Sequence, residues 1–211
     1  MSRVKRIVAL GVIVVLAEAG IVVWNTPSEA WRDIPAKSDY TKYTMEERVD
    51  VARAFAKRRK MSEETAFFVD YSIESGTPRF YVVNLRTGEV EKKIHVMHGA
   101  GGQSTAEKPE FSNKLGSKCS SLGRFLVSRE SGLTIKKSRR LVGLDVDNQT
   151  AQWRGLMIHA AGWVDKYKGR RYIPLNEHAS SGCVTIAKRE IDSILSIVDK
   201  SESPILLWTY N

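Results

Sequence analysis

One cysteine and one histidine near the end of the chain have the side chains needed for nucleophilic catalysis. Cys183 follows Gly182 in a Ser-Ser-Gly-Cys run, and His159 follows the apolar run Leu156-Met157-Ile158, which predicts a buried strand. A cysteine is a strong nucleophile only as the thiolate, so it needs a base within hydrogen-bond reach. We therefore predict that Cys183 is the nucleophile and that His159, at the end of its strand, is the base.

The residues just before Cys183 suit the second requirement of such chemistry, which is stabilisation of an oxyanion by backbone N–H groups. Gly182 lets the backbone approach a substrate without a Cβ in the way. The N–H groups from Ser181 to Cys183 could point into one small concavity. We predict that Ser181 and Gly182 shape the oxyanion site.

These motifs carry a resemblance to a known family. Ile158-His159 and Ser180-Ser181-Gly182-Cys183 resemble the signature of the YkuD-type L,D-transpeptidases. The upstream motifs, in the same order, resemble the branch called the murein L,D-transpeptidase catalytic domain family. They are Phe68-Val69-Asp70-Tyr71-Ser72, Arg79-Phe80-Tyr81-Val82-Val83, His98-Gly99, Phe111-Ser112-Asn113, Ser120-Ser121-Leu122-Gly123 and Gly143-Leu144-Asp145.

The resemblance implies an activity and a substrate. In such enzymes a cysteine thiolate attacks a murein tetrapeptide stem, releases its terminal D-alanine and forms a thioester. The amine of a second stem then completes a cross-link in the cell wall. Carried over to this chain, Cys183 is the nucleophile, His159 the base, and Ser181 and Gly182 part of the oxyanion site. The chemistry requires no metal and no organic cofactor.

Five further residues are candidates for binding the substrate: His98, Ser120, Ser121, Arg154 and Ser180. The resemblance places the glycine-rich loop after His98 beside the catalytic cleft, although such a loop could equally be a plain hairpin connection. The two loop serines could hydrogen-bond a peptide or satisfy local backbone groups. Arg154 could clamp a carboxylate or hold the loop that carries Asp145 and Asp147.

The chain departs from the common family pattern around the cysteine. Ser181 stands where many members have a histidine, and His178 could take over that role. Thr185 stands where many members have a basic residue or asparagine two positions after the cysteine. Recognition of the substrate carboxylate could therefore pass to Arg154, Arg170 or Arg171.

The predicted elements are mainly strands. The capping-box pattern that starts at Thr44 predicts a packing helix that ends near Lys57 to Lys60. Short β-branched and aromatic runs with tight turns then predict an antiparallel β-sandwich or meander of the L,D-transpeptidase type. One helix follows Cys183, and Pro204 to Trp208 is the last strand. The fold class is therefore mainly β (α+β).

The spacing of His95 and His98 resembles a metal motif, His-x-x-His. On a strand, however, residues i and i+3 point to opposite faces, so the two imidazoles cannot share one ion. We predict no metal site there.

The N-terminus predicts export. Arg3, Lys5 and Arg6 precede the apolar run from Ile7 to Leu16, as in a signal peptide. Cleavage after a small-x-small site and retention as an anchor up to Trp24 both remain open. We predict a signal peptide or anchor over 1–24, a linker over 25–43 and a catalytic domain over 44–211. The expected location is then the periplasm or the cell envelope. If the N-terminal segment is retained as an anchor, it attaches the protein to the inner membrane.

The net charge limits the expected binding partners, and the cysteine content limits the expected disulfides. The net charge of +9, from 33 basic and 24 acidic residues, suits stem-peptide carboxylates or an anionic membrane surface, although a solvated surface explains it equally. No aromatic-interleaved basic patch is present, so nucleic acid is not expected. The two cysteines, Cys119 and Cys183, could form one disulfide in an exported protein, but the setting of Cys183 favours free thiols.

Three alternatives to a transferase remain. An L,D-carboxypeptidase or a hydrolase of murein linkages would use the same acyl-enzyme, so the sequence does not separate it from a transpeptidase. An inactive wall-binding module is disfavoured by the intact pair of Cys183 and His159. A zinc peptidase is disfavoured because no carboxylate is evident to support the imidazoles.

Overall fold

The computed structural model describes residues 43–167, 169–175 and 179–211. The predictions for the signal or anchor segment, for the linker up to residue 42 and for His178 lie outside the described residues, so the proposed division of the chain stays a prediction. Among the residues that are described, no helix is both long enough and apolar enough to cross a membrane.

The first helix is set by its cap, as predicted. In α1 (Met45–Arg58), the Thr44 hydroxyl accepts a hydrogen bond from the Glu47 backbone N–H at 3.2 Å. The Glu47 carboxylate accepts in return from the Thr44 N–H at 2.8 Å. Such a cap contributes about 1 kcal/mol to helix stability. The basic residues Lys57 and Arg58 fall in the last turn, where they complement the helix dipole.

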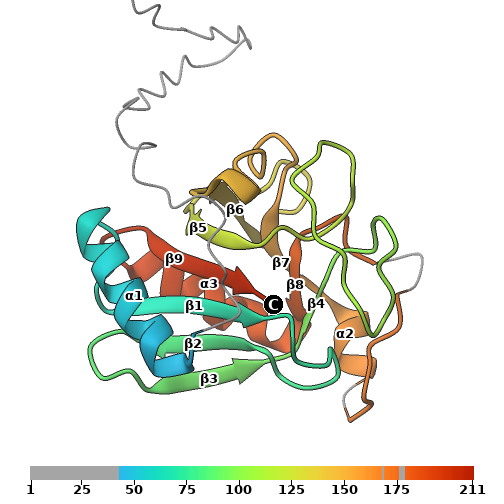
Figure 1. Cartoon of the computed structure of the whole chain (residues 1–211), viewed down its shortest axis with the longest axis horizontal. Coiled ribbons are helices and arrows are strands. Elements are labelled where there is room, and N and C mark those ends of the chain that lie inside the picture. Colours follow the sequence, from blue (N-terminus) through green and yellow to red (C-terminus); the bar gives the residue numbers. More distant parts are fainter. Residues whose placement is uncertain (1–42, 168, 176–178) are drawn as a thin grey trace, which may run out of the picture. The chain divides into compact units, whose positions relative to one another are not determined.

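Nine strands form a mixed sheet in the order β3-β2-β1-β9-β5-β6-β7-β8-β4 (Figure 1). The strands are β1 (Thr65–Asp70), β2 (Phe80–Asn84), β3 (Val90–Ile94), β4 (Val96–Met97), β5 (Gly123–Val127), β6 (Ser138–Gly143), β7 (Met157–Ala161), β8 (Val184–Ala187) and β9 (Ile205–Tyr210). The remaining elements are η2 (Val146–Asn148), α2 (Gly162–Lys166), η3 (Lys188–Glu190) and α3 (Ile191–Lys200). The predicted mainly β fold, with one helix before the sheet and one after Cys183, is confirmed.

Most strand pairs are antiparallel, but two are parallel. β1 pairs in parallel with β9, and β7 pairs in parallel with β8. The sequence patterns predicted an antiparallel arrangement because tight turns join neighbouring strands. Both parallel pairs instead join strands that are far apart in the chain, which local patterns do not reveal.

The sheet separates two apolar layers. Along β1, Phe67 and Val69 pack into the layer that holds α3, whereas Ala66 and Phe68 pack into the layer that holds α1. This alternation follows from the two-residue period of a strand. Figure 1 shows α1 and α3 on either side of this part of the sheet. The strands β7 and β8, beside which the predicted catalytic residues lie, belong to the layer that holds α3.

The predicted continuous strand from Val90 to Met97 is broken at His95. The part before the break, β3, pairs with β2, whereas the part after it, β4, pairs with β8. The two ends of the strand order are therefore adjacent in the chain. Met97 lies opposite Thr185, so this crossing carries the loop that begins at His98 to the end of β8 nearest Cys183.

Candidate active site

The register of β7 and β8 brings the predicted nucleophile and base to one face. His159 lies directly opposite Thr185 in this parallel pair. Cys183 precedes Thr185 by two residues, and residues two apart on an extended chain point to the same face. The thiol and the imidazole therefore share one side of the β7–β8 pair, although they are separated by 24 positions in sequence.

The imidazole of His159 is held by two hydrogen bonds. Its Nδ1 lies 3.3 Å from the Ala160 carbonyl oxygen, and its Nε2 lies 3.2 Å from the Thr185 hydroxyl oxygen. A carbonyl can only accept, so Nδ1 carries the proton and neutral His159 keeps Nε2 as an acceptor. Burial lowers the pKa of His159, and the Ala160 carbonyl partly opposes this effect. The ring is therefore a neutral base with a defined basic nitrogen.

Cys183 is a partly exposed free thiol, and its Sγ lies 3.9 Å from the Gly155 carbonyl oxygen. Burial raises the pKa of the Cys183 thiol. The Met157 backbone N–H, the Ser180 hydroxyl and the Arg154 charge each favour the thiolate and so lower this pKa. Groups that favour negative charge on the sulfur thus come from two segments of the chain, the one that leads into β7 and the turn before Cys183.

The turn before Cys183 is closed by Ser180. Its hydroxyl accepts from the Gly182 N–H at 3.1 Å and donates to the Cys183 carbonyl at 2.9 Å. The Gly182 N–H is thus already hydrogen-bonded within the turn. The role of Gly182 that the structure shows is to allow the backbone conformation and close packing of this turn. Its φ is +106°, and an added Cβ would collide with the Cys119 carbonyl oxygen. Ser181 is exposed at the tip of the turn.

Arg154 holds the loop beside this turn. Its Nη1 donates to the Ser112 carbonyl at 2.7 Å and to the Ser121 hydroxyl at 2.6 Å, and its Nη2 donates to the Cys119 carbonyl. The sequence had suggested a substrate carboxylate or the loop of Asp145 and Asp147 as its partner. In the structure its partners lie in the loop over 112–121. Burial lowers the pKa of Arg154, while the two cysteines act in the opposite direction.

His98, one of the predicted substrate-binding residues, is fully buried. Its Nε2 lies 2.8 Å from the Thr105 carbonyl oxygen, and its Nδ1 lies 2.9 Å from Arg79 Nη2. With both ring nitrogens engaged and no surface exposed, His98 fixes the glycine-rich loop in this structure. His95 bonds a different partner, the Gly76 carbonyl, at 2.9 Å. The two imidazoles of the His-x-x-His motif thus have separate partners.

The predicted serines Ser120 and Ser121 are also buried. The Ser120 hydroxyl accepts from the Gly99 N–H at 2.9 Å, which ties the loop over 112–121 to the glycine-rich loop. The Ser121 hydroxyl donates to the Ser112 carbonyl at 2.9 Å. Gly99 also forms an isolated parallel bridge with Ser180, so three loops meet at the turn that precedes Cys183.

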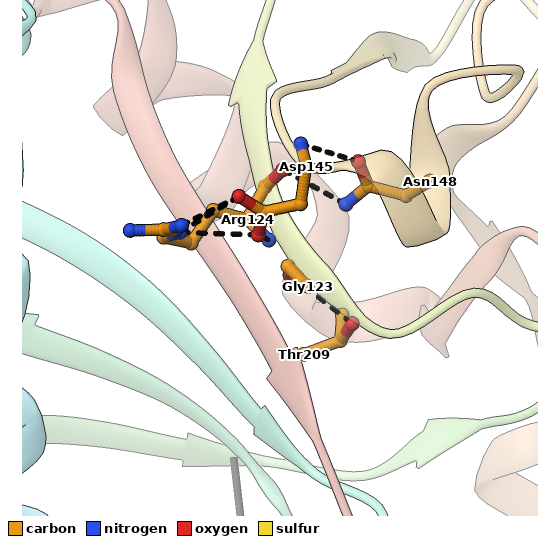
Figure 2. Close-up of polar contacts among 5 residues, drawn as sticks. All are labelled: Gly123, Arg124, Asp145, Asn148 and Thr209. Carbon is orange, nitrogen blue, oxygen red and sulfur yellow. Dashed lines mark hydrogen bonds and ion pairs between the residues drawn. The ribbon is translucent and has the colours of Figure 1, made fainter. Parts of the chain in front are cut away.

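A buried ion pair fixes the far end of the loop over 112–121 (Figure 2). Arg124 donates to both Asp145 oxygens, with Nη2–Oδ1 and Nε–Oδ2 distances of 2.6 and 3.0 Å. Asn148 closes the cluster, since its side chain donates to the Arg124 carbonyl at 2.8 Å and accepts from the Asp145 N–H at 2.9 Å. Thr209 of β9 donates to the Gly123 carbonyl, which joins the cluster to the sheet. Asp145, part of a recognised motif, therefore has a structural role.

Comparison with known proteins identifies the family. The model of a family described as "L,D-transpeptidase catalytic domain" matches residues 36–208. The chain belongs to this L,D-transpeptidase family. No curated protein matches the chain.

Among solved structures, one similar to this L,D-transpeptidase domain is the LD transpeptidase LdtMt1 in complex with imipenem. It is 16% identical, with 69% of this chain and 59% of that chain covered and a TM-score of 0.39. Another is the helical cell shape determining protein Pgp2 from Campylobacter jejuni. It is 12% identical, with 77% and 55% covered and a TM-score of 0.40. The chain therefore spans less than two thirds of each of these proteins.

Two residues of this domain were given no role by sequence reasoning. Arg79 is buried and donates to the Val96 carbonyl at 3.1 Å and the Ile73 carbonyl at 2.8 Å, besides its contact with His98. Burial lowers the pKa of Arg79 to about 10. Thr185 contacts the imidazole of His159 directly. For Arg79, the available signal in the sequence was an arginine at the start of an apolar strand. For Thr185, the signal was its departure from the family pattern.

Proposed function

We propose that this chain is a cysteine-dependent L,D-transpeptidase that cross-links peptidoglycan stem peptides through a thioester on Cys183. The observation that carries the proposal is the register of β7 and β8, which sets Cys183 and His159 on one face. The orientation of the ring supports it, because Nδ1 is held by the Ala160 carbonyl and Nε2 remains basic. Export to the cell envelope is part of the proposal, since the substrate lies there.

In the proposed reaction, His159 Nε2 takes the proton of the Cys183 thiol. The sulfur attacks the carbonyl carbon of the stem, and negative charge develops on the carbonyl oxygen. The backbone N–H of Cys183 faces this oxygen in our proposal, because the Gly182 N–H already donates to Ser180. Collapse breaks the C–N bond, the imidazolium protonates the departing amine of D-alanine, and the thioester remains.

The second half-reaction decides between transfer and hydrolysis. When the amine of another stem attacks the thioester, His159 removes its proton and the thiol is regenerated with a new peptide bond. When water attacks instead, the product is a shortened stem. Both outcomes use the same acyl-enzyme, so the acceptor has to be tested directly.

Stem recognition is proposed to depend on the three loops that meet at the turn before Cys183. The exposed Ser181 is the turn residue best placed for direct contact with a ligand. The other five candidates act in this proposal mainly by holding the loops, since each one forms hydrogen bonds with protein groups. They are Ser120, Ser121, Ser180, His98 and Arg154.

The first experiment measures the intact mass of the full-length protein after incubation with a carbapenem, which acylates reactive cysteines of this kind. Wild type and Cys119→Ala are expected to gain one adduct, and Cys183→Ala none. Cys119 is the matched control because it is a buried free thiol whose pKa burial raises.

The second experiment supplies a tetrapeptide stem that ends in D-alanine, with and without a second stem as amine acceptor. Release of D-alanine together with a cross-linked dimer supports the transferase. Release with only a shortened stem indicates the hydrolase. Absence of both an adduct and D-alanine release would overturn the proposed enzyme and favour a wall-binding module.

A further inference from the structure

Thr185 is buried beside the catalytic imidazole. It is the second residue of β8, lies opposite His159 in the parallel register and is 1% exposed. Its hydroxyl oxygen is 3.2 Å from His159 Nε2, the nitrogen that has to take the proton from the thiol. Thr185 also shares its face with Cys183, two residues earlier on the same extended segment.

The hydroxyl can serve both protonation states of the ring. With Nδ1 donating to the Ala160 carbonyl, neutral His159 offers only a lone pair at Nε2, so the Thr185 hydroxyl donates to it. For Nε2 to take the thiol proton, the hydroxyl has to rotate its hydrogen away from the ring; once Nε2 carries a hydrogen, the same hydroxyl oxygen becomes the acceptor. A hydrogen bond from a charged donor is stronger than one between neutral groups, so the contact favours the imidazolium.

We propose that Thr185 is a positioning residue for the His159 base, which holds Nε2 toward the face of Cys183 and stabilises the imidazolium formed when the thiol is activated. The proposal rests on the proposed role of His159. It also gives a purpose to Thr185 at a position where many family members have a basic residue or asparagine.

Few other titratable or charged groups near His159 are available to interact with a charge on its ring. On β6 the residue opposite His159 is Ser138, which is neutral. Arg139, next to it, is bound by the Asp199 carboxylate, and Asp165 of α2 is bound by Arg189. Directly before β8, the neighbouring titratable group is Cys183 itself, the partner in the proposed reaction. Among the described residues, Thr185 is thus the side chain that contacts Nε2.

The test is an NMR titration of the His159 ring in the full-length protein, with the resonance assigned through His159→Gln. Thr185→Val keeps the volume and removes the hydroxyl, whereas Thr185→Ser keeps the hydroxyl. Loss of the charge-assisted bond is expected to lower the pKa of His159 in Thr185→Val by about half a pH unit or more, and to slow carbapenem acylation about fivefold. Thr185→Ser should stay close to wild type in both measurements.

An unchanged pKa of His159 in Thr185→Val would overturn the proposal, even if acylation slows, because slower acylation alone indicates a packing role. Equal effects in the valine and serine variants would overturn it as well. Thr185→Ala is the second variant lacking a hydroxyl, in case the valine protein does not fold. The titration needs no substrate, so it judges Thr185 independently, whereas failure of wild type to form an adduct or release D-alanine counts against the proposed function.

Discussion

Burial of His98 makes the stability of the domain depend on pH. His98 has no exposed surface, and both of its ring nitrogens have partners, one of them the Arg79 guanidinium. Burial, assisted by the Arg79 charge, lowers the pKa of His98 to about 4. A histidine in an unfolded chain has a pKa of about 6.5. Between these pH values the unfolded chain binds a proton that the folded chain does not.

The sign and size of the effect follow from this difference. At about 1.4 kcal/mol per pH unit, a drop from about 6.5 to about 4 corresponds to about 3 kcal/mol of folding free energy. Because the folded-state pKa is the lower one, this stability is fully present above pH 6.5. It is lost progressively as the pH falls toward 4, and little further change comes from His98 below that value.

Urea unfolding of full-length wild type and His98→Gln, each at pH 7.5 and pH 4, tests this reasoning. Glutamine is neutral at every pH and can still donate to the Thr105 carbonyl. Other groups titrate in both proteins, so the difference between the two free energies of unfolding isolates His98. We expect the free energy of unfolding of wild type, relative to that of His98→Gln, to be about 3 kcal/mol smaller at pH 4 than at pH 7.5. An equal difference between the two free energies of unfolding at both pH values would refute this role of His98.

Two further predictions concern the loops around Cys183. Asp145→Asn leaves the buried Arg124 charge without its carboxylate, so urea unfolding should show a loss of about 3 kcal/mol or more, against less than about 1 kcal/mol for Asp192→Asn in the exposed pair with Lys137. Similar losses in the two variants would contradict the structural role of the buried pair. Gly182→Ala should slow carbapenem acylation at least tenfold, because its Cβ meets backbone, whereas at Gly116, also at positive φ, an added Cβ meets nothing within 4 Å. An equal rate in Gly182→Ala and wild type would show that this turn tolerates a side chain.

Local patterns predicted much of the fold. The capping box at Thr44 fixed the start of α1, and β-branched runs located β1 and β2, because these signals depend only on neighbouring residues. The strand β8 was missed, although its apolar run directly follows Cys183. The parallel pairing of β1 with β9 was missed as well. Which distant strands pair depends on packing of the whole sheet, which no short stretch of sequence contains.

The same division holds at the site. Cys183 and His159 could be nominated from the sequence because the chemistry restricts which residue types can act, and their catalytic roles stay a prediction. The roles of Arg79, Arg154 and Thr185 were not, since each depends on a tertiary contact. A buried arginine that donates to loop carbonyls looks, in a sequence, like any surface arginine. The predicted ligand-binding role of Arg154 and its observed loop contacts call for the same residue type.

The electrostatics of the pair explain why a third residue is useful. Burial raises the pKa of Cys183 and lowers that of His159, so both effects favour the neutral thiol and neutral imidazole at rest. In the proposed reaction, the charged pair would then form during attack, at a free-energy cost that nearby polar groups have to offset. Arg154 and the Met157 N–H act on the sulfur, and Thr185 acts on the imidazole.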